Sequence, residues 1–274
     1  NLLWHAQAPV WMFKDSLGNT VSKEVLLARL KEHITTVVNH YKGRIYAWDV
    51  VNEAVDDNPS TYLRNSMWYQ ICGEDFISKA FEYAHAADPK AALYYNDYNS
   101  ENESKRDKIY KLLKSLVDAK VPITGVGLQG HWNLNSPSVE LIEEAIDKYK
   151  SLGLKIQITE LDITVRTRRN LPAPNTFGRP MEVDSGLTPA LAQQQAYRYA
   201  AIFNIFRKYK KDITNVTFWN VSDRHSWLDS RGGGLAGGAA ATQGTGNLVR
   251  KAYPLLFDID LKPKLAYWAV VNFR

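Results

Sequence analysis

Residues 46–57 read Tyr46-Ala47-Trp48-Asp49-Val50-Val51-Asn52-Glu53-Ala54-Val55-Asp56-Asp57. The stretch opens with aromatic and β-branched residues, which predict a buried strand. It then stops at Asn52 and Glu53, and a turn follows. In a parallel α/β barrel the chemistry lies at the carboxyl ends of the strands. An acid at this position, with an amide beside it, is therefore a candidate catalytic group.

A second stretch, Lys155-Ile156-Gln157-Ile158-Thr159-Glu160-Leu161-Asp162, repeats this pattern of a strand that ends in acids. Two strand-end carboxylates in one barrel favour glycoside hydrolysis, which uses a pair of Asp or Glu residues around the scissile bond. In a retaining enzyme one carboxyl group protonates the leaving oxygen, and the other attacks the sugar carbon. Glu53 and Glu160 are the candidates for this pair.

Strand alternation adds candidates and sets one condition. Side chains on alternate residues share a face, so Glu160 and Asp162 point the same way, and His131 at another strand end is expected to bridge them. The same alternation puts Asn52 and Glu53 on opposite faces. Both can serve one site only if their strand kinks or bulges there.

Strands and helices are expected to alternate along the whole chain. Strands are expected near Leu3, Tyr46, Leu93, Val126, Ile158 and Phe218, and helices at 22–41, 74–87, 103–119, 136–152, 189–211 and 264–271. This pattern predicts a parallel sheet covered by helices, in one catalytic domain spanning residues 1–274. A closed (β/α)8 barrel has eight strands. We therefore expect an α/β barrel of the TIM type with only about six strands in this chain, incomplete at its N-terminal side.

Composition narrows the function further. The 274 residues carry a formal net charge of +5, but Lys and Arg are interspersed with Asp and Glu, so no nucleic-acid partner is expected. No apolar run is long enough to span a membrane. Cys72 is the single cysteine, and we expect it in the core. The histidines lack zinc-type spacing, so neither a metal nor a cofactor is expected.

Three further segments carry structural expectations. The charge run at 105–108 is expected on the exposed face of its helix. Residues 164–188 are expected to be irregular. The stretch at 231–246, rich in Gly, Ala and Thr, lacks the Lys-Ser/Thr of a phosphate loop and is expected to be a surface loop.

Six short motifs, in this order, resemble those of the family 10 glycoside hydrolases, the endo-β-1,4-xylanases. They are Leu3-Trp4-His5-Ala6-Gln7-Ala8-Pro9, Trp48-Asp49-Val50-Val51-Asn52-Glu53, Tyr95-Asn96-Asp97-Tyr98-Asn99, Gly127-Leu128-Gln129-Gly130-His131, Ile158-Thr159-Glu160-Leu161-Asp162 and Phe218-Trp219-Asn220-Val221-Ser222-Asp223. The resemblance covers nearly the whole chain.

The resemblance implies a role for each candidate residue. Glu53 would be the general acid/base and Glu160 the nucleophile. Asn52 would bond the 2-hydroxyl of the sugar being cleaved, while His131 and Asp162 would tune Glu160. The substrate-binding residues would be His5, Gln129, Trp219 and Trp227 before the cleavage point, and Tyr98 beyond it. The substrate would be xylan or xylo-oligosaccharides, and the location would be secreted or extracellular.

The chain also departs from the family. The family's first two strands, with their Asn-Glu-x-Lys motif, have no counterpart, so either a second polypeptide or segment supplies them or the fold rearranges. Asn220 stands where the family usually has Gly. Two alternatives to xylan hydrolysis stay open at this point: a related barrel hydrolase acting on another β-glycan, and a barrel fragment that binds glycan without cleaving it.

Overall fold

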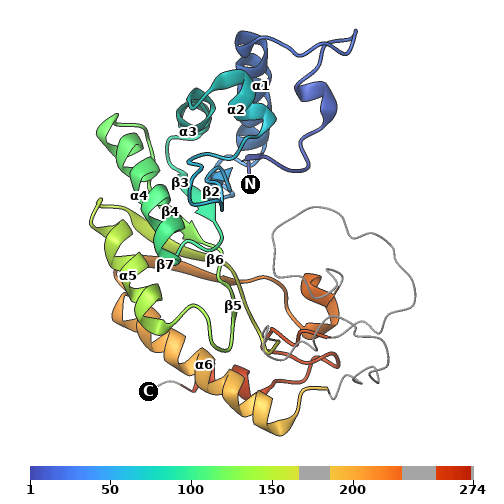
Figure 1. Cartoon of the computed structure of the whole chain (residues 1–274), viewed down its shortest axis with the longest axis vertical. Helices are drawn as coiled ribbons and strands as arrows, with labels where there is room; N and C mark the ends of the chain where they lie inside the picture. The colour runs from blue at the N-terminus through green and yellow to red at the C-terminus, as the bar shows by residue number, and fades with distance from the viewer. Residues whose placement is uncertain (167–185, 230–250, 273–274) are drawn as a thin grey trace. The chain divides into compact units, whose positions relative to one another are not determined.

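The computed structural model describes residues 1–166, 186–229 and 251–272 (Figure 1). These residues form two structural units. The first comprises Asn1–Gln129, Leu141–Ile158 and Asp212–Asn215, and the second comprises the described residues within Gly130–Glu140, Thr159–Lys211 and Val216–Arg274. Two expected loops, residues 167–185 of the irregular segment and the glycine-rich stretch at 231–246, lie outside the described residues. The single domain predicted from the sequence stays a prediction.

A parallel sheet forms the centre of the first unit. Its strands are β1 (Leu3–Trp4), β2 (Ala47–Asn52), β3 (Ala92–Asp97), β4 (Gly125–Leu128) and the first part of β6 (Lys155–Thr164). They are hydrogen-bonded in that order, and each adjoining pair is parallel. Strands β3, β4 and β6 are buried along almost their whole length, as expected for a sheet covered on both faces.

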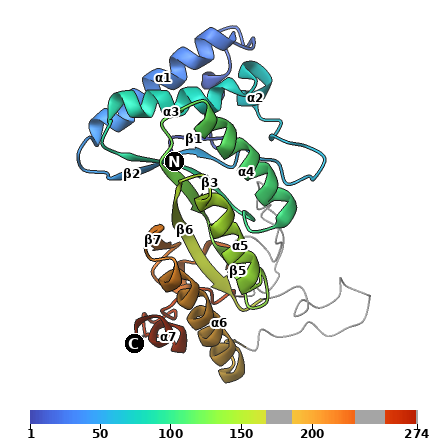
Figure 2. The same cartoon turned by 90° about the vertical axis from the view of Figure 1, so that its left-hand side faces the viewer.

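Helices pack around this sheet. They are the 3-10 turn η1 (Val10–Met12), α1 (Lys23–His40), α2 (Met67–Cys72), α3 (Asp75–Ala87), α4 (Glu103–Asp118) and α5 (Val139–Lys150), whose first two residues belong to the second unit. Helix α1 starts after Ser22, whose Oγ accepts a hydrogen bond from the Val25 amide. Helices α1 and α3 lie side by side (Figures 1 and 2). Cys72 is buried, as expected.

The prediction that the charge run at 105–108 is exposed is wrong for its first two residues. Lys105 and Arg106 are only 4% and 8% exposed. Lys105 Nζ lies 2.9 Å from a carboxylate oxygen of Asp97, and Arg106 Nη1 lies 2.8 Å from one of Glu144. Opposite charges from β3 and α5 therefore make burial of these two cations tolerable.

The second unit contains the remaining elements. They are β5 (His131–Asn133), the end of β6, the end of β7 (Ile213–Phe218), α6 (Pro189–Lys208), the 3-10 turns η3 (Asp223–His225) and η4 (Trp227–Asp229), and α7 (Leu265–Val271). Strand β5 pairs in parallel with the end of β6, and β7 also pairs with β6. Helices α6 and α7 lie side by side (Figure 2). No helix in the described part of the chain is long and apolar enough to cross a membrane.

One predicted strand proves to be two. The sequence suggests a single strand from residue 123 to 129 that runs into His131 and Trp132. The structure instead ends β4 at Leu128 and starts β5 at His131, with Gly130 between them at φ +82°. Glycine adopts this left-handed conformation without steric cost, so the chain can turn there. The described residues thus form seven strands. The next helix also starts later than expected, at Val139 instead of near Ser136.

Candidate active site

Glu53 lies at a kink immediately after β2. The pairing of β2 with β3 shifts by one residue between Asp49 and Val51, which marks a bulge. Glu53 itself has φ +57°, a left-handed conformation that is costly for a residue with a side chain. As a result Asn52 and Glu53 do not diverge: Asn52 Nδ2 donates to Glu53 Oε1 over 3.2 Å. The kink that the alternation argument required is therefore present.

Two further neutral donors hold the Glu53 carboxylate. Gln129 Nε2 donates to Oε1 and Trp4 Nε1 donates to Oε2, each over 2.9 Å. His5 Nδ1 lies 3.8 Å from Oε2. Burial, followed by the positive charge of Arg64, lowers the pKa of His5 despite the opposing charge of Glu53. His5 is therefore neutral at neutral pH. Glu53 is only 9% exposed, and the polar groups around its carboxyl group are uncharged.

A second amide fixes the first. Asn96 Nδ2 donates to Asn52 Oδ1 over 2.9 Å, which leaves Asn52 Nδ2 directed at Glu53. Neither the role of Asn96 in orienting Asn52 nor the hydrogen bond from Trp4 to Glu53 was predicted from the sequence. The sequence does show an Asn near the end of each of the two strands, and in the structure Asn96 on β3 pairs with Asn52 on β2.

Tyr98 lies in a cluster of charges in the first unit. Its hydroxyl donates to Asp57 and accepts from Arg64 Nη2, the latter over 3.0 Å. The ammonium of Lys105 lies 3.6 Å from the centre of the Tyr98 ring, a cation–π contact. Burial raises the pKa of Tyr98 to about 12, so its hydroxyl stays protonated. One ring face is thus occupied by the protein, and contact with a sugar remains a prediction.

Glu160, His131 and Asp162 form a second cluster, which lies in the second unit. His131 Nε2 lies 3.1 Å from Glu160 Oε2, and His131 Nδ1 lies 3.0 Å from Asp162 Oδ2. The pairing of β5 with β6 sets His131 opposite Asp162, and alternation puts Glu160 on the same face. Burial opposes a charge on the imidazole, but Asp162 and then Glu160 outweigh it and raise the pKa of His131 to about 9.

Two tryptophans flank this cluster. Trp227 Nε1 donates to Asp162 Oδ2 over 2.8 Å, and the centre of its ring lies 4.8 Å from that of His131. The Trp219 ring stands edge-on to His131 at 6.5 Å and is 44% exposed as a residue. Together with Asn220 they line an open cavity of about 460 Å³. Flat aromatic faces exposed beside a carboxylate suit the apolar faces of sugar rings.

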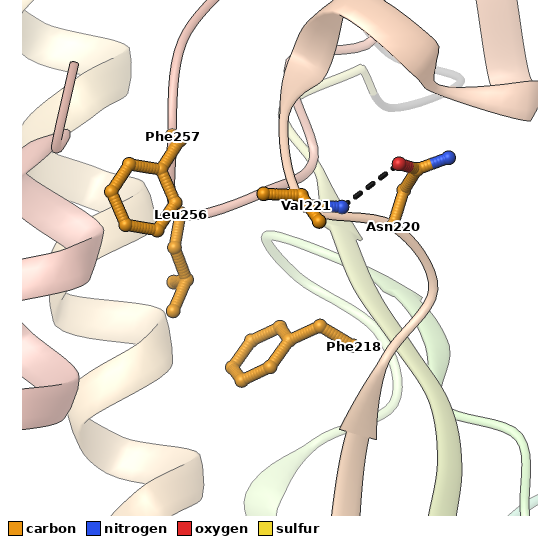
Figure 3. Close-up of a pocket in the computed structure, with 5 residues that line it drawn as sticks. All are labelled: Phe218, Asn220, Val221, Leu256 and Phe257. Carbon is orange, nitrogen blue, oxygen red and sulfur yellow. Dashed lines mark hydrogen bonds between the residues drawn. The ribbon is translucent and has the colours of Figure 1, made fainter. Parts of the chain in front are cut away.

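Asn220 lines this cavity and also a second one. Its φ is +146°, which favours the glycine expected from the resemblance. Its side chain bonds the local backbone: Oδ1 accepts from Val221 N over 2.8 Å, and Nδ2 donates to the His225 carbonyl over 2.9 Å. The second cavity, about 350 Å³, is lined by Asn220, Val221 and the apolar side chains of Phe218, Leu256 and Phe257 (Figure 3).

Comparison with known proteins decides the family. A family model described as "Glycosyl hydrolase family 10" matches residues 1–273 of this chain. The chain belongs to glycosyl hydrolase family 10. It is 48% identical to an endo-1,4-beta-xylanase of Geobacillus stearothermophilus over 99% of its own length and 75% of the relative's. A beta-1,4-xylanase of Dictyoglomus thermophilum is 46% identical over 99% of this chain and 69% of the relative.

Solved structures agree with this assignment. Xylanase XynB from Paenibacillus barcinonensis superimposes with a TM-score of 0.85 at 42% identity, over 98% of this family 10 chain and 75% of the solved chain. An endo-1,4-beta-xylanase from Caldicellulosiruptor owensensis gives 0.84 at 44% identity, over 100% of this chain and 76% of the other. The fold class is thus confirmed as a (β/α)8 barrel, of which this chain forms part. Among the described residues, no group of three His, Cys, Asp or Glu side chains is arranged to hold a metal.

Proposed function

We propose that this family 10 chain is a retaining endo-β-1,4-xylanase with Glu53 as general acid/base and Glu160 as nucleophile. Family membership supports glycoside hydrolysis, and the relatives named as xylanases cover nearly the whole chain. The assignment of roles rests on the ion pair between His131 and Glu160. A cation beside a carboxylate stabilises its charged form, which is the form that attacks a sugar carbon.

The reaction has two steps. Glu53 donates its proton to the glycosidic oxygen while Glu160 attacks the anomeric carbon, so the bond to the leaving sugar breaks as the bond to Glu160 forms. Glu53, now a carboxylate, then takes a proton from water, and the water oxygen displaces Glu160. Two inversions return the original configuration. This chemistry requires carboxyl groups about 5–5.5 Å apart. That separation is a prediction for Glu53 and Glu160.

Neighbouring residues support each step. The hydrogen bonds from Trp4 and Gln129 hold the Glu53 carboxyl group in one orientation. Asn52 shares that environment, and we assign its amide to the 2-hydroxyl of the sugar being cleaved. His5 is assigned to the binding of sugars before the cleavage point. In the second unit, Trp219 and Trp227, which line the cavity, are assigned to sugar rings before the cleavage point.

Variants of the two glutamates test the proposal. Glu160→Gln should lower kcat on xylan by more than about 10³-fold, since no nucleophile remains. Glu53→Gln should lower kcat/KM on xylan by about 10²–10⁴-fold, the usual contribution of general acid catalysis. Glu32→Gln, an exposed glutamate on α1, is the control and should leave both values unchanged. Retained xylan cleavage in Glu160→Gln would refute the mechanism.

The stereochemistry of the product provides a second test. Proton NMR of the first sugars released from xylan should show the β-anomer before mutarotation, because the mechanism retains configuration. Release of the α-anomer would contradict a covalent intermediate on Glu160. The two carboxyl groups need no metal, so EDTA should leave the rate unchanged.

The substrate separates the alternatives. Cleavage of xylan with little cleavage of carboxymethyl-cellulose would support the proposed specificity, and the reverse would favour another β-glycan. Binding of xylan without any cleavage would favour a non-catalytic role. We also propose an extracellular location, because a polymer such as xylan does not cross membranes. Immunoblots of culture medium and washed cells would test the location.

A further inference from the structure

Side chains from other parts of the first unit hydrogen-bond to the backbone of the turn that follows β2. Glu53 is in a left-handed conformation at φ +57°, which is unfavourable for a residue with a side chain. Such a conformation persists only where the surroundings determine it. The hydrogen-bond partners of the backbone at residues 53–55 determine this conformation, and this backbone sets the direction in which the Glu53 carboxyl group points.

Arg64 holds this backbone through its carbonyl groups. Its Nε donates to the Glu53 carbonyl over 3.1 Å, and its Nη2 lies 3.4 Å from the Val55 carbonyl. The main-chain amide of Arg64 donates to the Ala54 carbonyl over 2.8 Å. One residue therefore bonds three consecutive carbonyl groups, beginning with that of Glu53.

Tyr95 holds the same backbone through its amide groups. Its hydroxyl accepts hydrogen bonds from the amides of Ala54 and Val55, each over 3.1 Å. The hydroxyl donates in turn to Asp97 Oδ2 over 2.5 Å, which fixes it as an acceptor for the two amides. Tyr95 lies on β3 and is fully buried, so this anchor belongs to the sheet.

Charged side chains keep both anchors in place, of which Asp97 and Lys105 are buried and Asp57 is partly exposed. Asp97 lies 2.9 Å from Lys105 Nζ, and the same ammonium lies 2.8 Å from Asp57. Asp57 also lies 3.4 Å from Arg64 Nη2. Burial opposes the charge of Arg64, but Tyr98 and Asp57 outweigh it and raise its pKa, so the guanidinium stays charged throughout the working range of pH. The planar guanidinium is thus fixed by Asp57 and Tyr98 at Nη2, while Nε faces the Glu53 carbonyl and Nη2 also faces that of Val55.

We propose that Arg64 and Tyr95 are positioning residues for the acid/base: they fix the backbone of residues 53–55 and thereby aim the Glu53 carboxyl group at the leaving oxygen. The inference rests on the proposed role of Glu53. Neither residue touches the reacting atoms in this scheme. Their effect is confined to the proton transfer, and this distinguishes positioning from a general contribution to stability.

Leaving groups of different basicity isolate that proton transfer. A sugar leaving group needs a proton, whereas 2,4-dinitrophenolate leaves without one. The test measures kcat/KM, which reports the first step, on xylotetraose and on 2,4-dinitrophenyl xylobioside. Arg64→Lys keeps the charge but loses the planar fork, and Tyr95→Phe removes only the hydroxyl. Each should lose about 10–100-fold on xylotetraose, a usual cost of misplacing a catalytic group by about 1 Å. Each should lose less than about 3-fold on the dinitrophenyl substrate.

Arg29→Lys is the matched control. Arg29 Nη1 also bonds three carbonyl groups, those of Trp11, Met12 and Lys14, over 2.5, 3.2 and 2.9 Å. Its loss should leave the ratio of the two kcat/KM values at the wild-type value. Melting temperatures of all variants show whether each is folded, and Tyr95→Phe carries the test if Arg64→Lys does not fold.

The outcomes separate the inference from the function it rests on. Equal losses on both substrates in the Arg64 and Tyr95 variants, or no loss on either, would overturn the inference. Glu53→Gln is measured alongside. If Glu53→Gln loses activity equally on both substrates, the acid role of Glu53 fails. If Glu53→Gln is selective for xylotetraose and the two positioning variants are not, only the inference fails.

Discussion

The charge of His131 should make a measurable, pH-dependent contribution to stability. Its pKa rises from the ordinary 6.5 to about 9 because Asp162 and Glu160 outweigh the cost of burial. Folding therefore favours the protonated ring. The contribution is fully present below pH 6.5 and is lost as the pH rises through about 9. At about 1.36 kcal/mol per pH unit, the difference amounts to about 3 kcal/mol. The His131 side chain is only 16% exposed, so solvent screening reduces this value little.

The assay compares the wild type with His131→Gln, which has no titrating ring. The free energy of unfolding is measured by urea titration at intervals from pH 6 to pH 10, with tryptophan fluorescence as the signal. The difference between wild type and variant should fall by about 3 kcal/mol across this range, most steeply between pH 7 and pH 9. His85→Gln, at an exposed position on α3, controls for the loss of an imidazole alone.

A constant difference would refute the reasoning. If the wild-type and His131→Gln curves run parallel from pH 6 to pH 10, the imidazole does not gain its proton on folding. A difference that grows with pH would mean that burial outweighs the two carboxylates, which is the opposite balance. Titration of the His131 ring protons by NMR in the folded protein gives an independent value, expected near pH 9.

Three substitutions elsewhere test the packing and the charges. Gly125→Ala would place a methyl group 2.3 Å from the Lys155 carbonyl oxygen, so we expect a lower free energy of unfolding, by about 3 kcal/mol or more in urea titration. The Lys264 ammonium lies 2.9 Å from the buried carboxylate of Asp223. Lys264→Met removes this cation and should lower the free energy of unfolding by about 3–5 kcal/mol in the same assay. Trp227→Phe removes the indole N–H that donates to a buried carboxylate and should cost about 1.5–3 kcal/mol; an unchanged midpoint in any of the three would contradict its stated cause.

Some contacts could be predicted because they are local to a strand. The alternation of side chains placed Glu160 and Asp162 on one face, and His131 does lie between them in the structure. The same rule showed that Asn52 and Glu53 needed a kink to act together. The rule could not locate that kink, because the bulge in β2 depends on its register with β3.

Other contacts escaped prediction because they join distant residues. Lys105 lies in a helix whose charge run is typical of an exposed face, yet its ammonium is buried against Asp57 and Asp97. Arg64 belongs to a loop with no motif, and only the folded chain shows it bonded to the Glu53 carbonyl. Gly130 could have marked a break in its strand, but a lone glycine in a strand pattern does not reveal that the chain starts a second strand after it.

The sequence by itself determined the class of fold and the candidate acids, because periodicity and strand ends are properties of neighbouring residues. Tertiary structure alone decided how each acid is surrounded. Glu53 lies among the neutral donors Trp4 and Gln129, and Glu160 lies beside the charged ring of His131. The charge state of a buried group depends on what lies within a few ångströms in space. Those neighbours come from segments that lie far from each acid in the sequence.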